Sequence, residues 1–213
     1  MQINQDVTLQ INPTLSAEVA AKNPLLETAI GPSAIEATWE LNGEPGRPSL
    51  ILRLRDQKGK LTSSATFATT ELKNESDLTT RLSQLNEALL TVAEWRKIVE
   101  ALFARIRPWC ISLPGGSYVT DKSGWVEEER SGGYEVSELI VTSGGAGMII
   151  TPVGAWILGA DGRVDINGPG DRRVLHYLRA TDSWYHVPND GPYRELPLTE
   201  MLFRELAEAC LDV

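Results

Sequence analysis

A run of apolar residues at three- and four-residue steps constrains the fold of this chain more than any other feature. Its members are Leu78, Leu82, Leu85, Leu89, Val92, Val99 and Ile106. This spacing predicts one long helix with an apolar face, with a break into two helices at Thr91 as the alternative, and Arg107-Pro108 predicts its end. Because the repeat is short and strand-like sequence precedes it, we interpret the apolar face as packed on a sheet and not as a coiled-coil seam.

Strand-like segments lie on both sides of this predicted helix. Three precede it, at residues 34–41, 49–55 and 61–70. Six follow it and are separated by glycine-rich turns, at residues 134–143, 146–152, 155–161, 163–167, 173–180 and 184–188. A second helix is predicted after Pro197. Because strands and helices are segregated along the chain, we predict an α+β fold with mainly antiparallel sheets, on which the long central helix and the C-terminal helix pack.

The element order is similar to that of small acidic secretion chaperones, and this resemblance involves no residue motif. Between the two strand groups, residues 113–133 are rich in glycine and polar residues, which predicts an irregular loop or linker. The predicted domains are therefore an N-terminal α+β half at 1–112, the loop at 113–133, and an antiparallel meander with a C-terminal helix at 134–213.

Composition narrows the classes of function. The 213 residues have a hydrophobic fraction of 42%, typical of a soluble globular protein, and a net charge of −9 that disfavours nucleic-acid binding. No apolar run is long enough for a membrane helix, and the first residues do not resemble a signal peptide, so we expect a cytoplasmic protein. Cys110 and Cys210 are too far apart in the sequence for a CxxC pair or a zinc motif, and the apolar residues around each predict two buried, reduced thiols. No metal or cofactor motif is found, and we expect neither.

Both histidines of the chain lie in one predicted hairpin, on either side of Asp182. Successive strand residues point to opposite faces of a sheet. A four-residue loop between Arg179 and Trp184 therefore places His176 and His186 on opposite faces. A three- or five-residue loop, or a bulge, would instead make them neighbours. We favour the four-residue loop, which disfavours a shared metal ion or catalytic triad.

Catalysis remains the alternative hypothesis. In a hydrolase, or in a small-molecule-binding protein, a pocket near His186 would lie between the two halves. His186 is then the candidate base, oriented by Asp182 or Asp190. The candidate nucleophile is Ser183 or Ser117. No catalytic motif supports this set, so we do not predict an enzyme.

The favoured hypothesis is a non-catalytic protein-interaction module, such as an adaptor, chaperone-like or accessory protein. Aromatic and arginine residues are common anchors of protein interfaces. Trp184, Tyr185, Tyr193 and Arg194 are close together in the chain and are the predicted partner-binding residues. We expect a protein partner, and self-association is left open.

Overall fold

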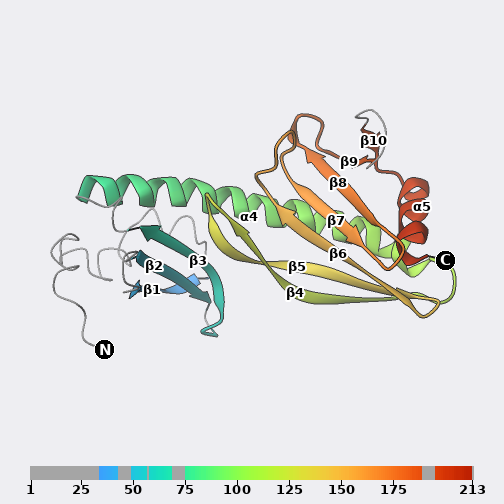
Figure 1. Ribbon diagram of the computed structural model, residues 1–213, viewed down its shortest axis with the longest axis horizontal. Helices are drawn as coiled ribbons and strands as arrows, with labels where there is room; N and C mark the ends of the chain where they lie inside the picture. Colours follow the sequence, from blue (N-terminus) through green and yellow to red (C-terminus); the bar gives the residue numbers. More distant parts are fainter. Residues whose placement is uncertain (1–33, 43–48, 57, 69–74, 189–194, 213) are drawn as a thin grey trace. The chain divides into compact units, whose positions relative to one another are not determined.

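The computed structural model describes residues 34–42, 49–56, 58–68, 75–188 and 195–212 (Figure 1). They belong to two compact units, each of which is described by itself. The first unit contains the chain up to Ala93 together with Glu127–Glu135. The second contains Glu94–Val126 and the chain from Val136 onward. These limits differ from those of the predicted halves.

The first unit is built on an antiparallel meander. Strands β1 (Ala34–Asn42), β2 (Ser49–Asp56) and β3 (Leu61–Ala68) pair in sequence order, which confirms the three predicted strands. Strand β3 also pairs with the beginning of β5 (Gly132–Ser143). At this pairing the Ser63 hydroxyl donates to the Gly133 carbonyl at 3.0 Å.

The predicted long helix is α4 (Glu75–Ile111), of 37 residues. Its buried side chains include Leu85, Val92, Trp95, Val99, Leu102, Phe103 and Ile106, as the apolar spacing predicted. The predicted end at Arg107-Pro108 is wrong, because the helix continues for about one more turn. Pro108 lacks only its own N–H, and its carbonyl still accepts a bond from the Ser112 N–H at 3.2 Å.

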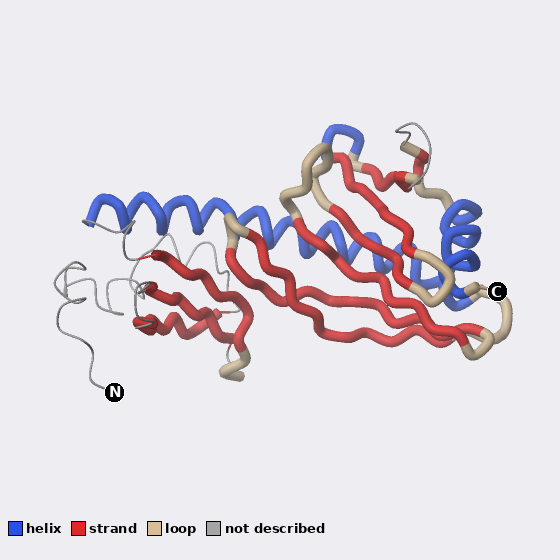
Figure 2. The backbone as a smooth tube through the Cα atoms, viewed as in Figure 1, coloured by secondary structure: helices blue, strands red, loops and turns tan. Residues whose placement is uncertain are grey.

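The antiparallel sheet continues in the second unit (Figure 2). From β5 it continues through β6 (Ala146–Gly154), β7 (Arg163–Asn167), β8 (Arg172–Leu178), β9 (Ser183–Val187) and β10 (Leu196–Pro197), each paired with the one before. Helix α5 (Glu200–Leu211) packs against β6, β7 and β8. The Thr199 hydroxyl caps this helix by accepting the Leu202 N–H. The predicted α+β class is confirmed.

One face of this sheet is covered by helices. Trp95 of α4 packs at a tilt against Trp184 of β9, with ring centroids 5.8 Å apart, and the Cys210 thiol of α5 donates to the Ile166 carbonyl. The two helices also contact each other through Trp109 and Phe203. We call this side the inner face; α4 passes behind the strands in Figure 1.

The other side, which we call the open face, carries the residues that alternate with the inner ones. In β8 the inner residues Leu175 and Tyr177 are buried, whereas the intervening Val174, His176 and Leu178 are partly exposed. The open face of β6 to β9 consists of Ile149, Thr151, Arg163, Asp165, Asn167, Arg172, Val174, His176, Leu178, Ser183, Tyr185 and Val187.

Residues 113–133 differ from the prediction of an irregular loop. Most of them form strand β4 (Tyr118–Glu128), which pairs with β5. Backbone hydrogen bonds hold this strand although most of its side chains are exposed, so its polar composition does not prevent pairing. Gly124 also has a steric role, because a Cβ atom there would lie 2.7 Å from the Glu138 carboxylate carbon.

The strand predicted at residues 155–161 is also wrong. This segment is a turn with a single bridge between Ile157 and Ala160, and Gly159 adopts a positive φ of 83°. Gly162 then returns the chain to the sheet so close to α4 that a Cβ atom would lie 2.1 Å from the Trp95 ring. The apolar run therefore forms a tight turn with Leu158 fully exposed. No described helix has the combined length and apolarity needed to cross a membrane.

Candidate interaction surface

The hairpin of β8 and β9 has the predicted loop size, shifted by one residue. Leu178 pairs with Ser183, so the four loop residues are 179–182. The loop consists of a short 3-10 helix, η3 (Arg179–Thr181), and Asp182. Asp182 has a φ of 47°, a left-handed conformation that aspartate tolerates well, and it accepts a hydrogen bond from the Tyr177 hydroxyl at 2.7 Å. These two features fix the observed register.

The two histidines lie on opposite faces of the sheet, as predicted. His176 pairs with Tyr185 on the open face, and His186 pairs with Leu175 on the inner face. His186 is 4% exposed, and its Nδ1 lies 3.0 Å from the Val174 carbonyl. Since a carbonyl only accepts, Nδ1 carries the proton. Burial lowers the pKa of His186, and the nearby Arg173 charge lowers it further, against the raising effect of the carbonyl bond.

The candidate catalytic residues are not assembled into a triad. Asp182 accepts from Tyr177, and the Ser183 hydroxyl donates to the Thr181 carbonyl. Asp182 and His186 are four residues apart along an extended segment, which separates their Cα atoms by about 13 Å.

The two further candidates of the catalytic hypothesis give it no support. The Ser117 hydroxyl donates to the Leu113 carbonyl. Asp190 lies outside the described residues. No described hydrogen bond therefore connects His186 with a candidate acid or nucleophile.

The predicted partner-binding residues are divided between the core and the surface. Trp184 is only 6% exposed and packs between the tilted rings of Trp95 and Tyr177, a buried position that does not fit the predicted role in partner binding. The inward parity of Trp184 in β9 is the reason. Tyr185 lies partly exposed on the open face, and its hydroxyl donates to the Thr181 hydroxyl. Tyr193 and Arg194 lie outside the described residues.

Apolar side chains on the open face were not anticipated as a site. An antiparallel sheet with one covered face usually presents polar residues on the other. Here Val174, Leu178 and Val187 point away from the helices and are partly exposed. The available signal was the apolar content at both parities of residues 173–178, where Val174 and Leu178 alternate with Leu175 and Tyr177.

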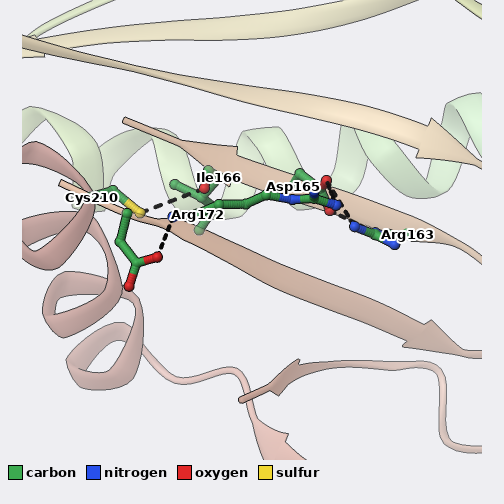
Figure 3. Close-up of polar contacts among 6 residues, drawn as sticks. Arg163, Asp165, Ile166, Arg172 and Cys210 are labelled. Atoms are coloured by element: carbon green, nitrogen blue, oxygen red, sulfur yellow. Dashed lines mark hydrogen bonds and ion pairs between the residues drawn. The ribbon is translucent and has the colours of Figure 1, made fainter. Parts of the chain in front are cut away.

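An ionic cluster lies in the middle of this face (Figure 3). Arg163 holds Asp165 in a bidentate pair, with Nε 2.7 Å from Oδ1 and Nη2 3.0 Å from Oδ2. Arg172 adds a third contact, from Nη2 to Oδ2 at 2.7 Å. The Asp165 side chain is 8% exposed, whereas that of Arg172 is 55% exposed. Burial raises the pKa of Asp165, against the lowering effects of Arg163 and of His176.

His176 lies directly opposite Arg163 in the pairing of β7 and β8. Its Nδ1 is enclosed and has no hydrogen-bond partner among the described residues. Burial lowers the pKa of His176, and the Arg163 charge lowers it further, against the raising effects of Glu195 and Asp165. The ring is therefore neutral at pH 7. In the sequence, only the spacing of Arg163 and Asp165, two residues apart in a strand, could have indicated the ionic cluster.

Both cysteines are buried free thiols, as predicted. Burial raises the pKa of Cys110 to about 12 and that of Cys210 to about 11, so neither is a reactive thiolate in the folded chain. Within the part of the chain that the structure describes, no group of three or more histidine, cysteine, aspartate or glutamate side chains is placed to hold a metal ion.

Comparisons with protein-family models, curated proteins and solved structures find no match to this chain.

Proposed function

We propose that this protein is a non-catalytic protein-interaction module, of the adaptor, chaperone-like or accessory kind, that binds its partner with the open face of β6 to β9. The observation that carries the proposal is the outward position of Val174, Leu178 and Val187, opposite the helix-covered face. Apolar surface left in water is unfavourable by about 25 cal/mol per Å². A partner that covers these side chains recovers that free energy.

The dimensions of the open face suit a recognition patch. The spacing between strands and the rise per residue along a strand give the four-strand face a projected area of roughly 300 Å². Exposed patches of mixed apolar character in this size range commonly mark interaction sites. A standard interface buries about 800 Å² on each partner, so the bound protein extends beyond the face.

The arrangement of the histidines supports a non-catalytic role. His186 uses Nδ1 to bond a backbone carbonyl in the core, and the residues proposed to work with it are bonded elsewhere. A general base must reach the proton that it removes. The described contacts of His186 therefore fit a structural role in the inner face better than the role of a general base.

The test compares partner recovery by matched variants of the full chain in its native host. Val174→Lys and Val187→Lys place a charge on the open face. Ala101→Lys places the same charge on an exposed position of α4, where lysine favours the helix. Tagged proteins are purified, and copurifying proteins are quantified by mass spectrometry.

We expect the wild type and Ala101→Lys to recover the same partner, and both open-face variants to lose it while keeping the wild-type circular dichroism spectrum and melting temperature. Retention of that partner by both folded open-face variants would contradict the proposal. So would copurification of a small ligand that His186→Gln removes, without any protein partner.

A further inference from the structure

The Arg163–Asp165–Arg172 cluster gives the open face a chemical preference. We propose that Arg163 and Arg172 bind a carboxylate of an acidic, extended segment of the partner protein, with Asp165 as the residue that positions the guanidinium groups. This inference rests on the proposed function, because it specifies the chemistry of a partner bound at the same face.

The geometry of Arg163 is that of a prepared hydrogen-bond donor. Its Nε and Nη2 bond both oxygens of Asp165, which fixes the plane of the guanidinium group. Its Nη1 makes no hydrogen bond to any residue that the structure describes. A guanidinium held in place in this way loses little conformational entropy when it binds a second carboxylate.

The local charge selects an anion. Two guanidinium groups surround one carboxylate, so the cluster has an excess of one positive charge in a chain whose net charge is −9. Asp165 already receives three contacts and is 8% exposed, which leaves little of it for a bound cation. Glu195, which precedes β10, also places negative charge near His176, where it raises the pKa of that ring. Screening over about 8 Å at physiological salt limits the repulsion by distant acidic residues.

The neighbours of the cluster favour a peptide over a free anion or a nucleic acid. Val174 pairs with Asp165 across β7 and β8, and Val187 continues the same row. In an extended segment, side chains on one side recur about every 7 Å. The same distance separates alternate residues such as Val174 and His176 along β8. A segment that follows β8, with an acidic residue opposite Arg172 and an apolar residue two positions along opposite Val174, therefore matches both the charged group and this valine.

The test measures binding of a capped oligoglutamate peptide to the isotope-labelled full chain by NMR. The Nε–H signals of Arg163 and Arg172 are assigned with Arg163→Lys and Arg172→Lys. We expect saturable shifts of both arginine signals and of the Val174 and Val187 amides. The affinity should fall at least about tenfold in Arg163→Gln, the loss expected when a charge-assisted hydrogen bond is removed.

The matched control is Arg179→Gln. Arg179 also pairs with a carboxylate, that of Glu94 at 3.0 Å, but it lies in the hairpin loop outside the open face. We expect this variant to bind the peptide as the wild type does. An equal loss of affinity in Arg179→Gln would overturn the inference, as would the absence of saturable shifts in the wild type.

Two further probes distinguish the ligand class. Capped oligoglutamine tests whether the peptide charge matters, and inorganic phosphate tests for a simple anion site. Equal binding of oligoglutamine, or tighter binding of phosphate than of oligoglutamate, would overturn the assignment to an acidic segment.

Loss of folding is controlled with a second variant. Arg163→Gln leaves Asp165 with fewer partners, so the double variant Arg163→Gln, Asp165→Asn removes both charges and avoids a buried unpaired carboxylate. It should be folded and should still bind the peptide more weakly than Asp165→Asn alone. If the acidic peptide fails to bind while Val174→Lys still abolishes capture of the native partner, this inference fails and the proposed function stands.

Discussion

The two faces of the sheet in the second unit are made by the same strands but differ in their side chains. On the inner face, Leu175 and Ile166 are fully buried under α4 and α5, and His186 is a buried polar member bonded to the backbone. On the open face, valines alternate with arginines, an aspartate and a histidine. The difference indicates that the inner face stabilises the unit, whereas the open face has side chains suited to recognition.

The largest expected effect is a difference in unfolding free energy between two adjacent residues of β8, one on each face of the sheet. Leu175→Ala removes a fully buried side chain from the inner face and should lower the free energy of unfolding by about 2–5 kcal/mol. Val174→Ala removes a partly exposed side chain from the open face and should cost under about 1 kcal/mol. Urea unfolding followed by tryptophan fluorescence measures both. Equal losses would show that the open face is packed as tightly as the core.

A smaller effect concerns the two histidines and pH. Both folded pKa values are lowered, so between them and the unfolded value near 6.5 the unfolded chain binds more protons than the folded chain. Stability should therefore fall as the pH drops through about 6.5, with a slope of at most about 1.4 kcal/mol per pH unit for each histidine.

Urea unfolding at a series of pH values, together with NMR titration of the two imidazoles, measures this dependence. His186→Gln and His176→Gln should each remove part of it. Added salt should weaken the charge contributions to both pKa shifts, that of Arg163 at His176 and that of Arg173 at His186. An unchanged slope in the double variant would contradict the predicted linkage.

The smallest expected effect is on the free energy of unfolding when a tyrosine hydroxyl is removed. Two such hydroxyls bond the same hairpin loop from opposite faces of the sheet. Tyr177→Phe removes a 2.7 Å bond to Asp182 from a buried ring and should cost about 1 kcal/mol. Tyr185→Phe removes an exposed 3.1 Å bond to Thr181 and should cost under about 0.5 kcal/mol.

Thermal unfolding of both tyrosine variants measures the difference. The pKa of Tyr177, raised to about 12 by burial and by Asp182, gives a second readout, since Asp182→Asn should lower it. A larger loss in Tyr185→Phe than in Tyr177→Phe would reverse the assignment of the two faces.

Much of the fold was accessible from local sequence pattern. The three strands before α4 and most of those after it were predicted close to their observed limits, because alternating apolar residues and glycine turns are local signals. Strand β4 was missed because pairing with β5 supplies its hydrogen bonds, and no pattern within residues 118–128 records that partner.

The candidate site was less accessible than the fold. Trp184 was predicted to bind a partner because aromatic and arginine residues, which are common interface anchors, cluster in this part of the sequence. The ring of Trp95, 89 positions earlier, covers it in the folded chain. The Asp165 cluster was not predicted because Arg172 joins it from the next strand, and the register of β7 and β8 brings the two together.

The sequence by itself determined the α+β class, the long helix and the separation of the two histidines, since each follows from a short-range period or from the parity of a loop. Only the tertiary structure decided which side of the sheet the helices cover. Both parities of β8 and β9 contain apolar residues, so the choice depended on long-range packing by α4 and α5. That packing buried Trp184 and left Val174, Val187 and the arginine cluster at the surface.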